Sequence, residues 1–158
     1  MIFQHTIENV LNGTKTQTSR IVKPGDYMRG ETCDWGIAFL SLPYYSPITN
    51  ICRKGRILWQ VGNTYAVQPG RGQKAVARIR ILGIGKEDVR GFSRIDGKAE
   101  GFNDEFDFWE TWCSMHDKHK SIPTQESNSW GTYLHLYALL GRPAELYQAW
   151  VINFELVS

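Results

Sequence analysis

A polar stretch at residues 13–20, with the sequence GTKTQTSR, places the strongest constraint on how this chain can fold. After its glycine it holds two cations, four hydroxyl side chains and no aliphatic one. In a strand, side chains alternate between faces, so Thr18 and Arg20 would point one way and Lys15 and Ser19 the other. A half-buried strand normally has one apolar face, which this stretch lacks. We therefore expect it to line a groove or pocket; the alternative is a solvated edge strand.

The residue types in this stretch suit both anion binding and catalysis. Arg20 offers a planar fork of donors and Lys15 a point charge, and both can hold a phosphate or carboxylate beside threonine hydroxyls. A lysine acts as a base or nucleophile only when neutral, and burial beside Arg20 would lower the pKa of Lys15. A catalytic site would also need a carboxylate. We name Glu100 as the candidate; the alternative is a solvated glutamate at the start of a helix.

The composition indicates a globular protein of one domain. The 158 residues are 42% hydrophobic and 22% charged, and no apolar run approaches the length of a membrane span. We found no secretory signal, and the odd number of cysteines argues against a disulfide framework. We therefore expect a cytoplasmic protein without membrane contact. The net charge of +2 is too small to indicate a polyanionic partner by itself.

Short helices and strands alternate without a repeating βαβ pattern, which predicts an α+β fold with a small, strongly bent sheet or barrel. The spacing of Phe3, Ile7, Val10 and Leu11 predicts a helix that stops at Gly13. Alternation predicts strands over residues 75–84 and 150–156, with Arg78 and Arg80 on one face of the former. We further expect a loop-rich segment at 27–49 with a possible strand at 37–42, a helical turn at 87–92, a helix capped by Asn103 or Asp104, a loop at 121–129 and a helix at 131–140.

A basic stripe is the second candidate feature. Its cations are Arg71, Lys74, Arg78 and Arg80, with Arg53, Lys54 and Arg56 upstream, and Trp59 and Tyr65 are interleaved with them. Cations that follow a phosphate backbone, together with aromatic faces for bases, are typical of proteins that bind single-stranded nucleic acid or RNA loops. The alternative is an ordinary solvated surface.

A metal site is not expected. Cys113, His116 and His119 lie three residues apart on the predicted helix, and each step of three turns the side chain by about 60° around the axis. The sequence signals no fourth ligand, so Cys113 is more simply a core residue. No cofactor fingerprint or Ser-His-Asp spacing is present.

These segments together resemble a known family. Residues 13–20 after a short helix are similar to the signature of the ASCH domain, a branch of the PUA-like superfamily. The resemblance continues in residues 23–26 (KPGD), 59–72 (WQVGNTYAVQPGRG), 75–81 (AVARIRI) and 99–102 (AEGF) and spans roughly residues 1–115. It implies a small, mostly antiparallel β-barrel with flanking short helices. The chain would then be a single such domain over residues 1–158, with insertions around 30–56 and a helical extension around 116–145.

The functions that this resemblance implies are divided. PUA-like domains bind RNA, some ASCH members are ribonucleases, and a compact bacterial branch removes the acetyl group from acetylated cytidine with a Lys, a Thr and a Glu. The Lys and Thr of that branch correspond to Lys15 and Thr18, and its neighbouring arginine to Arg20. Its carboxylate aligns with Phe102, two residues after Glu100.

Our first expectation is an RNA- or nucleotide-binding domain whose partner is RNA, single-stranded nucleic acid or a modified nucleoside. Lys15, Thr18 and Arg20 would form the floor of its cleft, and Arg71, Lys74 and Arg78 the rim. The alternative is a hydrolase, either a ribonuclease or an amidohydrolase in which Lys15, Thr18 and Glu100 are catalytic. A second alternative is a protein-interaction module that uses the aromatic residues of the segment around 30–50.

Overall fold

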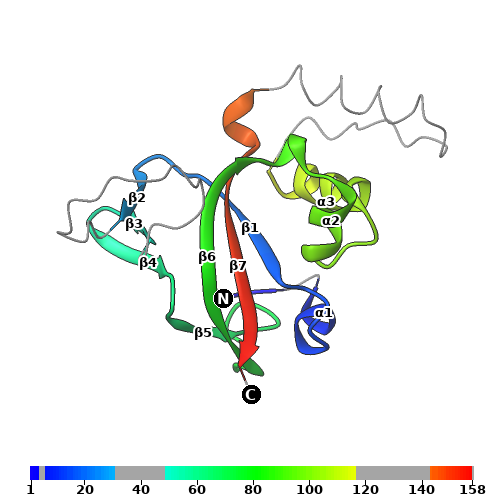
Figure 1. Cartoon of the computed structure of the whole chain (residues 1–158), viewed down its shortest axis with the longest axis horizontal. Coiled ribbons are helices and arrows are strands. Elements are labelled where there is room, and N and C mark those ends of the chain that lie inside the picture. Colours follow the sequence, from blue (N-terminus) through cyan, green and yellow to red (C-terminus); the bar gives the residue numbers. More distant parts are fainter. Residues whose placement is uncertain (4–5, 31–48, 117–142, 158) are drawn as a thin grey trace, which may run out of the picture.

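The computed structural model describes residues 1–3, 6–30, 49–116 and 143–157, and shows an α+β fold with mostly antiparallel sheets and few helices. The larger sheet has four strands in the order β1-β7-β6-β5, all antiparallel. They are β1 (Gln17–Ile21), β5 (Thr64–Val67), β6 (Ala77–Asp88) and β7 (Gln148–Val157). In Figure 1 the long strands β6 and β7 run through the centre of the molecule.

The predicted alternation in β6 is present. Ile79 and Ile81 are fully buried, while Arg78 and Arg80 are exposed on the opposite face. The final strand was predicted from alternation, which normally gives one buried face, yet Trp150, Val151 and Ile152 are all buried. Val151 and Trp150 point to opposite faces of this half of β7, and other parts of the chain cover both: Val151 shares a buried cluster with Trp109 and Trp112, and the Trp150 indole N–H donates to Asp26.

A second sheet consists of three antiparallel strands in the order β2-β3-β4, namely β2 (Asp26–Gly30), β3 (Thr49–Arg53) and β4 (Arg56–Gln60). It lies on the opposite side of β6 and β7 from the helices α2 and α3 (Figure 1). Lys54 and Gly55 join β3 to β4 and both have positive φ, 50° and 77°, as a tight hairpin of the I′ type requires. The expectation of a loop-rich segment is therefore wrong for residues 27–30 and 49, where strands form.

The expected barrel is not seen as a closed structure. The strands of the described residues pair as two separate sheets, and β1 and β5 are the outer strands of the larger one. The helical predictions at 131–140, the loop at 121–129 and the possible strand at 37–42 lie outside the described residues.

The helices are short. They are α1 (Ile7–Leu11), α2 (Arg94–Ala99) and α3 (Glu105–His116), with 3-10 turns at Val89–Gly91 and Ala144–Leu146. Asp104 caps α3, because its Oδ1 accepts hydrogen bonds from the backbone N–H groups of Phe106 and Asp107. None of these helices has the length and apolar character needed to cross a bilayer.

Sequence reasoning missed α2, which is short and contains Gly97, a poor helix former. Its start carries a capping box in which Ser93 and Asp96 satisfy each other's backbone N–H groups. The C-cap of α2 is Glu100, so this small helix sets the place of the candidate carboxylate.

Two hydrophobic clusters hold the sheet to the helices. One packs α3 against the ends of β6 and β7, and the other packs α1 and Phe3 against β5, β6 and β7. The first includes Phe92, Phe108, Trp109, Trp112 and Tyr147, whereas Phe102 and Phe106 are only partly buried at its edge. The polar stretch thus runs from the end of α1, which belongs to the second cluster, to Ile21, which packs against the first.

Candidate functional site

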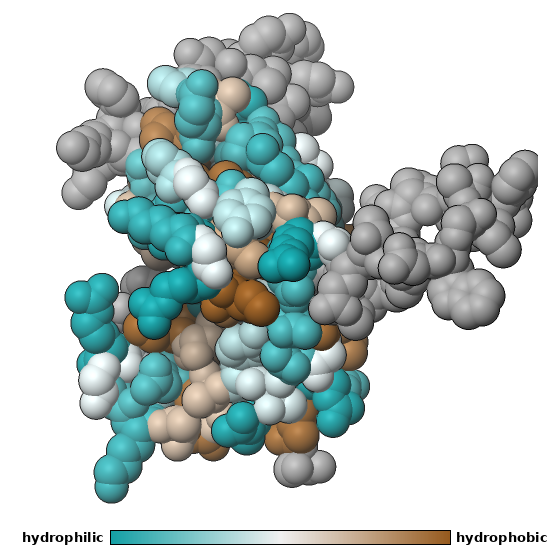
Figure 2. Space-filling view, turned by 90° about the vertical axis from the view of Figure 1, so that its left-hand side faces the viewer, coloured by the Kyte–Doolittle hydropathy of each residue, from teal (hydrophilic) through white to brown (hydrophobic). Residues whose placement is uncertain are grey.

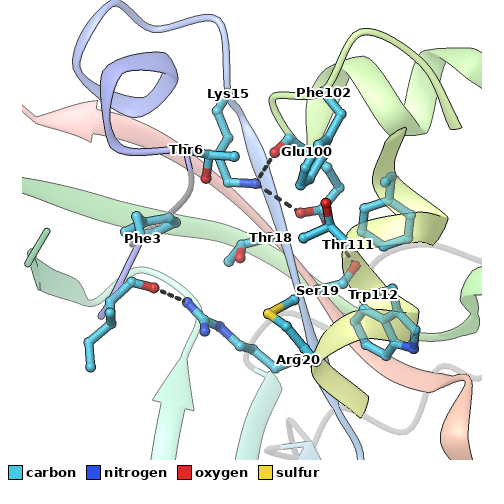
Figure 3. A pocket seen from close by; sticks show the side chains of 13 residues that line it. Phe3, Thr6, Lys15, Thr18, Ser19, Arg20, Glu100, Phe102, Thr111 and Trp112 are labelled. Atoms are coloured by element: carbon cyan, nitrogen blue, oxygen red, sulfur yellow. Dashed lines mark hydrogen bonds and ion pairs between the residues drawn. The ribbon is translucent and has the colours of Figure 1, made fainter. Parts of the chain in front are cut away.

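A cleft of about 190 Å³ opens between the N-terminal segment, β1 and α3. The strand β1 forms its floor, and side chains from both faces of β1 reach it because β1 is an outer strand of the sheet. Figure 3 shows Lys15 and Glu100 at one end, Arg20 and Phe3 toward the other, and Thr18 between them. The lining residues are Ile2, Phe3, Thr6, Lys15, Thr18, Ser19, Arg20, Glu100, Phe102, Phe108, Thr111, Trp112 and Met115.

Lys15 and Glu100 form a buried pair at this end of the cleft. Lys15 Nζ lies 2.9 Å from Glu100 Oε2 and also donates to the Glu100 backbone carbonyl. Lys15 is 4% exposed and Glu100 2%, so the contact is almost entirely shielded from solvent. The structure therefore brings the polar stretch and the candidate carboxylate together across 85 residues of sequence.

Ser19 is a member of the site that sequence reasoning did not select. Its hydroxyl donates to Glu100 Oε1 over 2.6 Å, while Oε2 of the same carboxylate accepts from Lys15. Both oxygens of Glu100 are thus engaged, and its orientation is determined. The signal was present in the sequence, because alternation puts Ser19 on the same face as Lys15.

Backbone hydrogen bonds hold the segment that carries Lys15 next to α1 and to the end of α2. The backbone N–H of Lys15 donates to the Asn9 carbonyl over 2.8 Å, and that of Thr16 to the Ala99 carbonyl over 3.0 Å. The Asn9 side chain in turn donates to the Gly101 carbonyl over 2.5 Å. Gly101 has φ +85°, and a Cβ there would meet Asn9 and Lys15 at 3.2 Å, so only glycine fits easily.

The surroundings of Lys15 in the cleft lower the pKa of its amine. Burial lowers the pKa of Lys15 from its ordinary value; Glu100 opposes this shift and the positive charge of Arg20 adds to it, leaving the pKa lowered. Burial also lowers the pKa of Arg20, with Glu100 again opposing.

Aromatic rings form much of the cleft wall. Phe3 comes from the N-terminal segment, Phe102 from the link between α2 and α3, and Phe108 and Trp112 from α3 (Figure 3). Lys15 Nζ lies 5.9 Å from the centroid of Phe102. Phe102 is therefore a wall residue, and the carboxylate at Lys15 comes from Glu100 two positions earlier, because the C-cap of α2 points its side chain at Lys15.

The basic stripe lies apart from the cleft, since none of Trp59, Tyr65, Arg71, Lys74 and Arg78 lines it. Arg71 and Lys74 are exposed on the connection between β5 and β6. Tyr65 pairs with the buried Ile79, which places it on the face of the sheet opposite to Arg78. Arg80 lies 3.2 Å from Glu155 in an exposed ion pair.

The face that carries the small sheet is mainly hydrophilic with scattered hydrophobic side chains (Figure 2). Tyr27, Met28 and Ile57 are exposed on this sheet, at 45%, 44% and 53%. The aromatic residues expected to form a protein-interaction surface, around 30–50, lie almost entirely outside the described residues.

No metal ligand cluster is formed by the residues that the structure describes, in which His119 is not included. Cys113 is buried in the core with its Sγ 3.6 Å from the Tyr147 hydroxyl. Cys52 is also a free, buried cysteine.

Comparisons with known proteins leave the family open. No family model matches the chain, and the search of curated proteins found no match. Among solved structures, the chain is similar to protein EF3133 from Enterococcus faecalis V583, described under the family model DUF984. The TM-score is 0.43 at 13% identity, and the alignment covers 98% of this chain and 71% of that one.

Proposed function

We propose that this protein is a hydrolase of small N-acyl amides, with Lys15, Thr18 and Glu100 as its catalytic residues. The observation that carries the proposal is the buried amine of Lys15, which donates to two acceptors, both on Glu100. A neutral amine has two N–H donors, so a neutral Lys15 can make both contacts and still keep its lone pair free. A free lone pair in a small cleft is what a general base needs.

We propose the following reaction for these residues. Neutral Lys15 accepts a proton from a water molecule as the water oxygen attacks the acyl carbon, and the Thr18 hydroxyl donates to the developing oxyanion. The carbon–nitrogen bond then breaks, and the proton passes from Lys15 to the departing amine. Amide and water thus become carboxylic acid and amine. Glu100 orients Lys15 and stabilises it while it carries the proton.

We propose the substrate class from the residues that form the cleft walls and from the family resemblance. A cleft of about 190 Å³ with aromatic sides suits a flat ring with short substituents, and it is too small for a folded RNA. The ASCH branch with this Lys and Thr acts on acetylated cytidine, which makes an acetylated cytidine nucleoside the first substrate to test. We also propose the PUA-like ASCH relationship itself on the motif at residues 13–20.

The test is the release of cytidine and acetate from N4-acetylcytidine, followed by chromatography. Lys15→Met should lower kcat/KM by about 10²- to 10⁴-fold, the usual contribution of a general base. Lys74→Met, which removes an exposed lysine outside the cleft, is the matched control and should act like the wild type. Absence of hydrolysis by a folded wild-type protein, or full activity of a folded Lys15→Met variant, would contradict the proposal.

Binding of RNA or nucleotides is the second candidate function. What favours it is the run of exposed cations at Arg71, Lys74 and Arg78, of which Arg78 contacts only the Thr64 hydroxyl, over 2.9 Å, among the described residues. The ribonuclease form would use Lys15 and Arg20 on the scissile phosphate. Affinity for labelled single-stranded RNA should fall steeply between low and physiological salt. If affinity is indifferent to salt, or unchanged in Arg71→Gln/Lys74→Gln, the cations do not bind RNA.

A further inference from the structure

Arg20 is a partly buried cation with an incomplete set of hydrogen-bond partners among the described residues. Its Nη2 donates to the Ile2 carbonyl over 2.8 Å, and its guanidinium carbon lies 5.7 Å from the centroid of the Phe3 ring. Its Nε is buried and has no hydrogen-bond acceptor among the described residues. A buried N–H without an acceptor is unfavourable, so Arg20 has unused donor capacity at the cleft.

Three other arginines each pair with a carboxylate. Arg53 contacts Asp26, Arg80 contacts Glu155 and Arg90 contacts Asp88, each within salt-bridge distance. Arg20 has no such contact with a carboxylate in the part of the chain that the structure describes, although it is far less exposed than Arg80.

Glu100 forms its salt bridge with Lys15 and is not within salt-bridge distance of Arg20. Its Oε2 accepts from Lys15 and its Oε1 from Ser19, so both oxygens are already engaged. Lys15, Arg20 and Glu100 are the charged residues that line the cleft, which leaves it with one excess positive charge when Lys15 is protonated. Burial lowers the pKa of Arg20, and the negative charge of Glu100 opposes this shift.

We propose that the cleft takes substrates that carry an oxyanion, a phosphate or a carboxylate, and that Arg20 binds this group. The planar guanidinium presents paired donors that match two oxygens of such a group. This inference rests on the proposed function for the other half of the substrate, because it places the reacting amide at Lys15 and the oxyanion at the opposite end. Phe102 beside Lys15 and Phe3 beside Arg20 contact the body of the molecule.

The test uses the nitrogen-15 NMR signal of the Arg20 Nε–H group, assigned by its loss in Arg20→Gln. Inorganic phosphate and acetate are titrated separately at constant ionic strength, with chloride as the control anion. We expect phosphate or acetate to shift the Arg20 signal saturably, while the signal of the exposed Arg71 changes little. If neither anion shifts the Arg20 signal, or if Arg71 responds equally, the inference is wrong. This readout needs no turnover.

Matched ligand pairs then distinguish the two oxyanions. Cytidine 5′-monophosphate is compared with cytidine, and N-acetylglycine with N-acetylglycinamide, by calorimetry on the wild type, Arg20→Gln and Arg20→Lys. The member with the oxyanion should bind about tenfold tighter or more to the wild type in at least one pair, and this advantage should be lost in Arg20→Gln. Equal affinities within both pairs would overturn the inference, even if Lys15 proves essential for hydrolysis.

Discussion

Lys15 is an unusual lysine because its charged end is buried and both of its hydrogen bonds go to one residue, Glu100. Sequence reasoning pointed to Lys15, Thr18 and Arg20, because a strand without an apolar face is expected to line a groove or pocket. It did not locate Glu100 relative to them, because that contact spans 85 residues and depends on how α2 ends. Ser19 was overlooked because serine is common in solvated strands.

The lowered pKa of Lys15 leads to a prediction about pH. If neutral Lys15 is the base, kcat/KM rises with pH and levels off, with a midpoint below the ordinary lysine value of 10.5. Glu100 raises the pKa of Lys15, so Glu100→Gln should move the midpoint to lower pH as well as reduce the plateau. The pH profile of each variant measures this. Glu155→Gln, at a surface glutamate, should leave the midpoint in place, and an unmoved midpoint in Glu100→Gln would contradict the assignment.

At the level of elements, α2 is the part that determines the site. It is six residues long, yet its C-cap supplies Glu100 and its start is fixed by Ser93 and Asp96. Periodicity cannot detect so short a helix, whereas β6 with its twelve residues was predictable from alternation alone. Gly97 permits α2 to pack tightly against the start of α3.

Gly97→Ala tests this packing. A Cβ at Gly97 would lie 2.4 Å from the Asp104 carbonyl carbon and 2.5 Å from its oxygen, so the two helices have to separate. We expect the free energy of unfolding to fall by about 1–3 kcal/mol, as for other overpacked sites, and the turnover to fall because Glu100 shifts. Urea denaturation and the hydrolysis assay measure the two effects. Gly91→Ala is the control, since a Cβ there meets nothing within 4 Å. If the two variants have the same free energy of unfolding, the prediction is wrong and α2 tolerates displacement.

At the scale of the whole molecule, Asp26 links the two sheets. Its carboxylate accepts from Arg53 in β3 and, over 3.3 Å, from the indole N–H of Trp150 in β7. Burial alone would raise the pKa of Asp26, but the hydrogen bonds from Arg53, the Lys23 backbone and Trp150 together outweigh it and leave the pKa lowered. The small sheet was not predicted: the pairing of β2 with β3 spans residues 31–48 and leaves no local signal, although the hairpin that joins β3 to β4 is local.

Asp26→Asn should therefore destabilise the protein in a pH-dependent way. A carboxylate whose pKa is lowered in the folded state stabilises that state above the unfolded pKa, and this contribution is lost as pH falls through the folded pKa. We expect a loss of about 1–3 kcal/mol in the free energy of unfolding at neutral pH, shrinking below the ordinary value of 3.8. Urea denaturation at several pH values measures it. A pH-independent difference would mean that the charge of Asp26 does not contribute.

The sequence by itself determined the features that depend on near neighbours: the first helix, the alternation in β6, the cap of α3 and the unusual polarity of residues 13–20. Only the tertiary structure decided which of the polar residues meet. It joined Lys15 to Glu100 and Ser19, left Arg20 without a carboxylate partner among the described residues, and placed Arg71, Lys74 and Arg78 away from the cleft. The physical reason is that periodicity reports which face a side chain occupies, whereas contacts between distant segments depend on sheet order and helix packing.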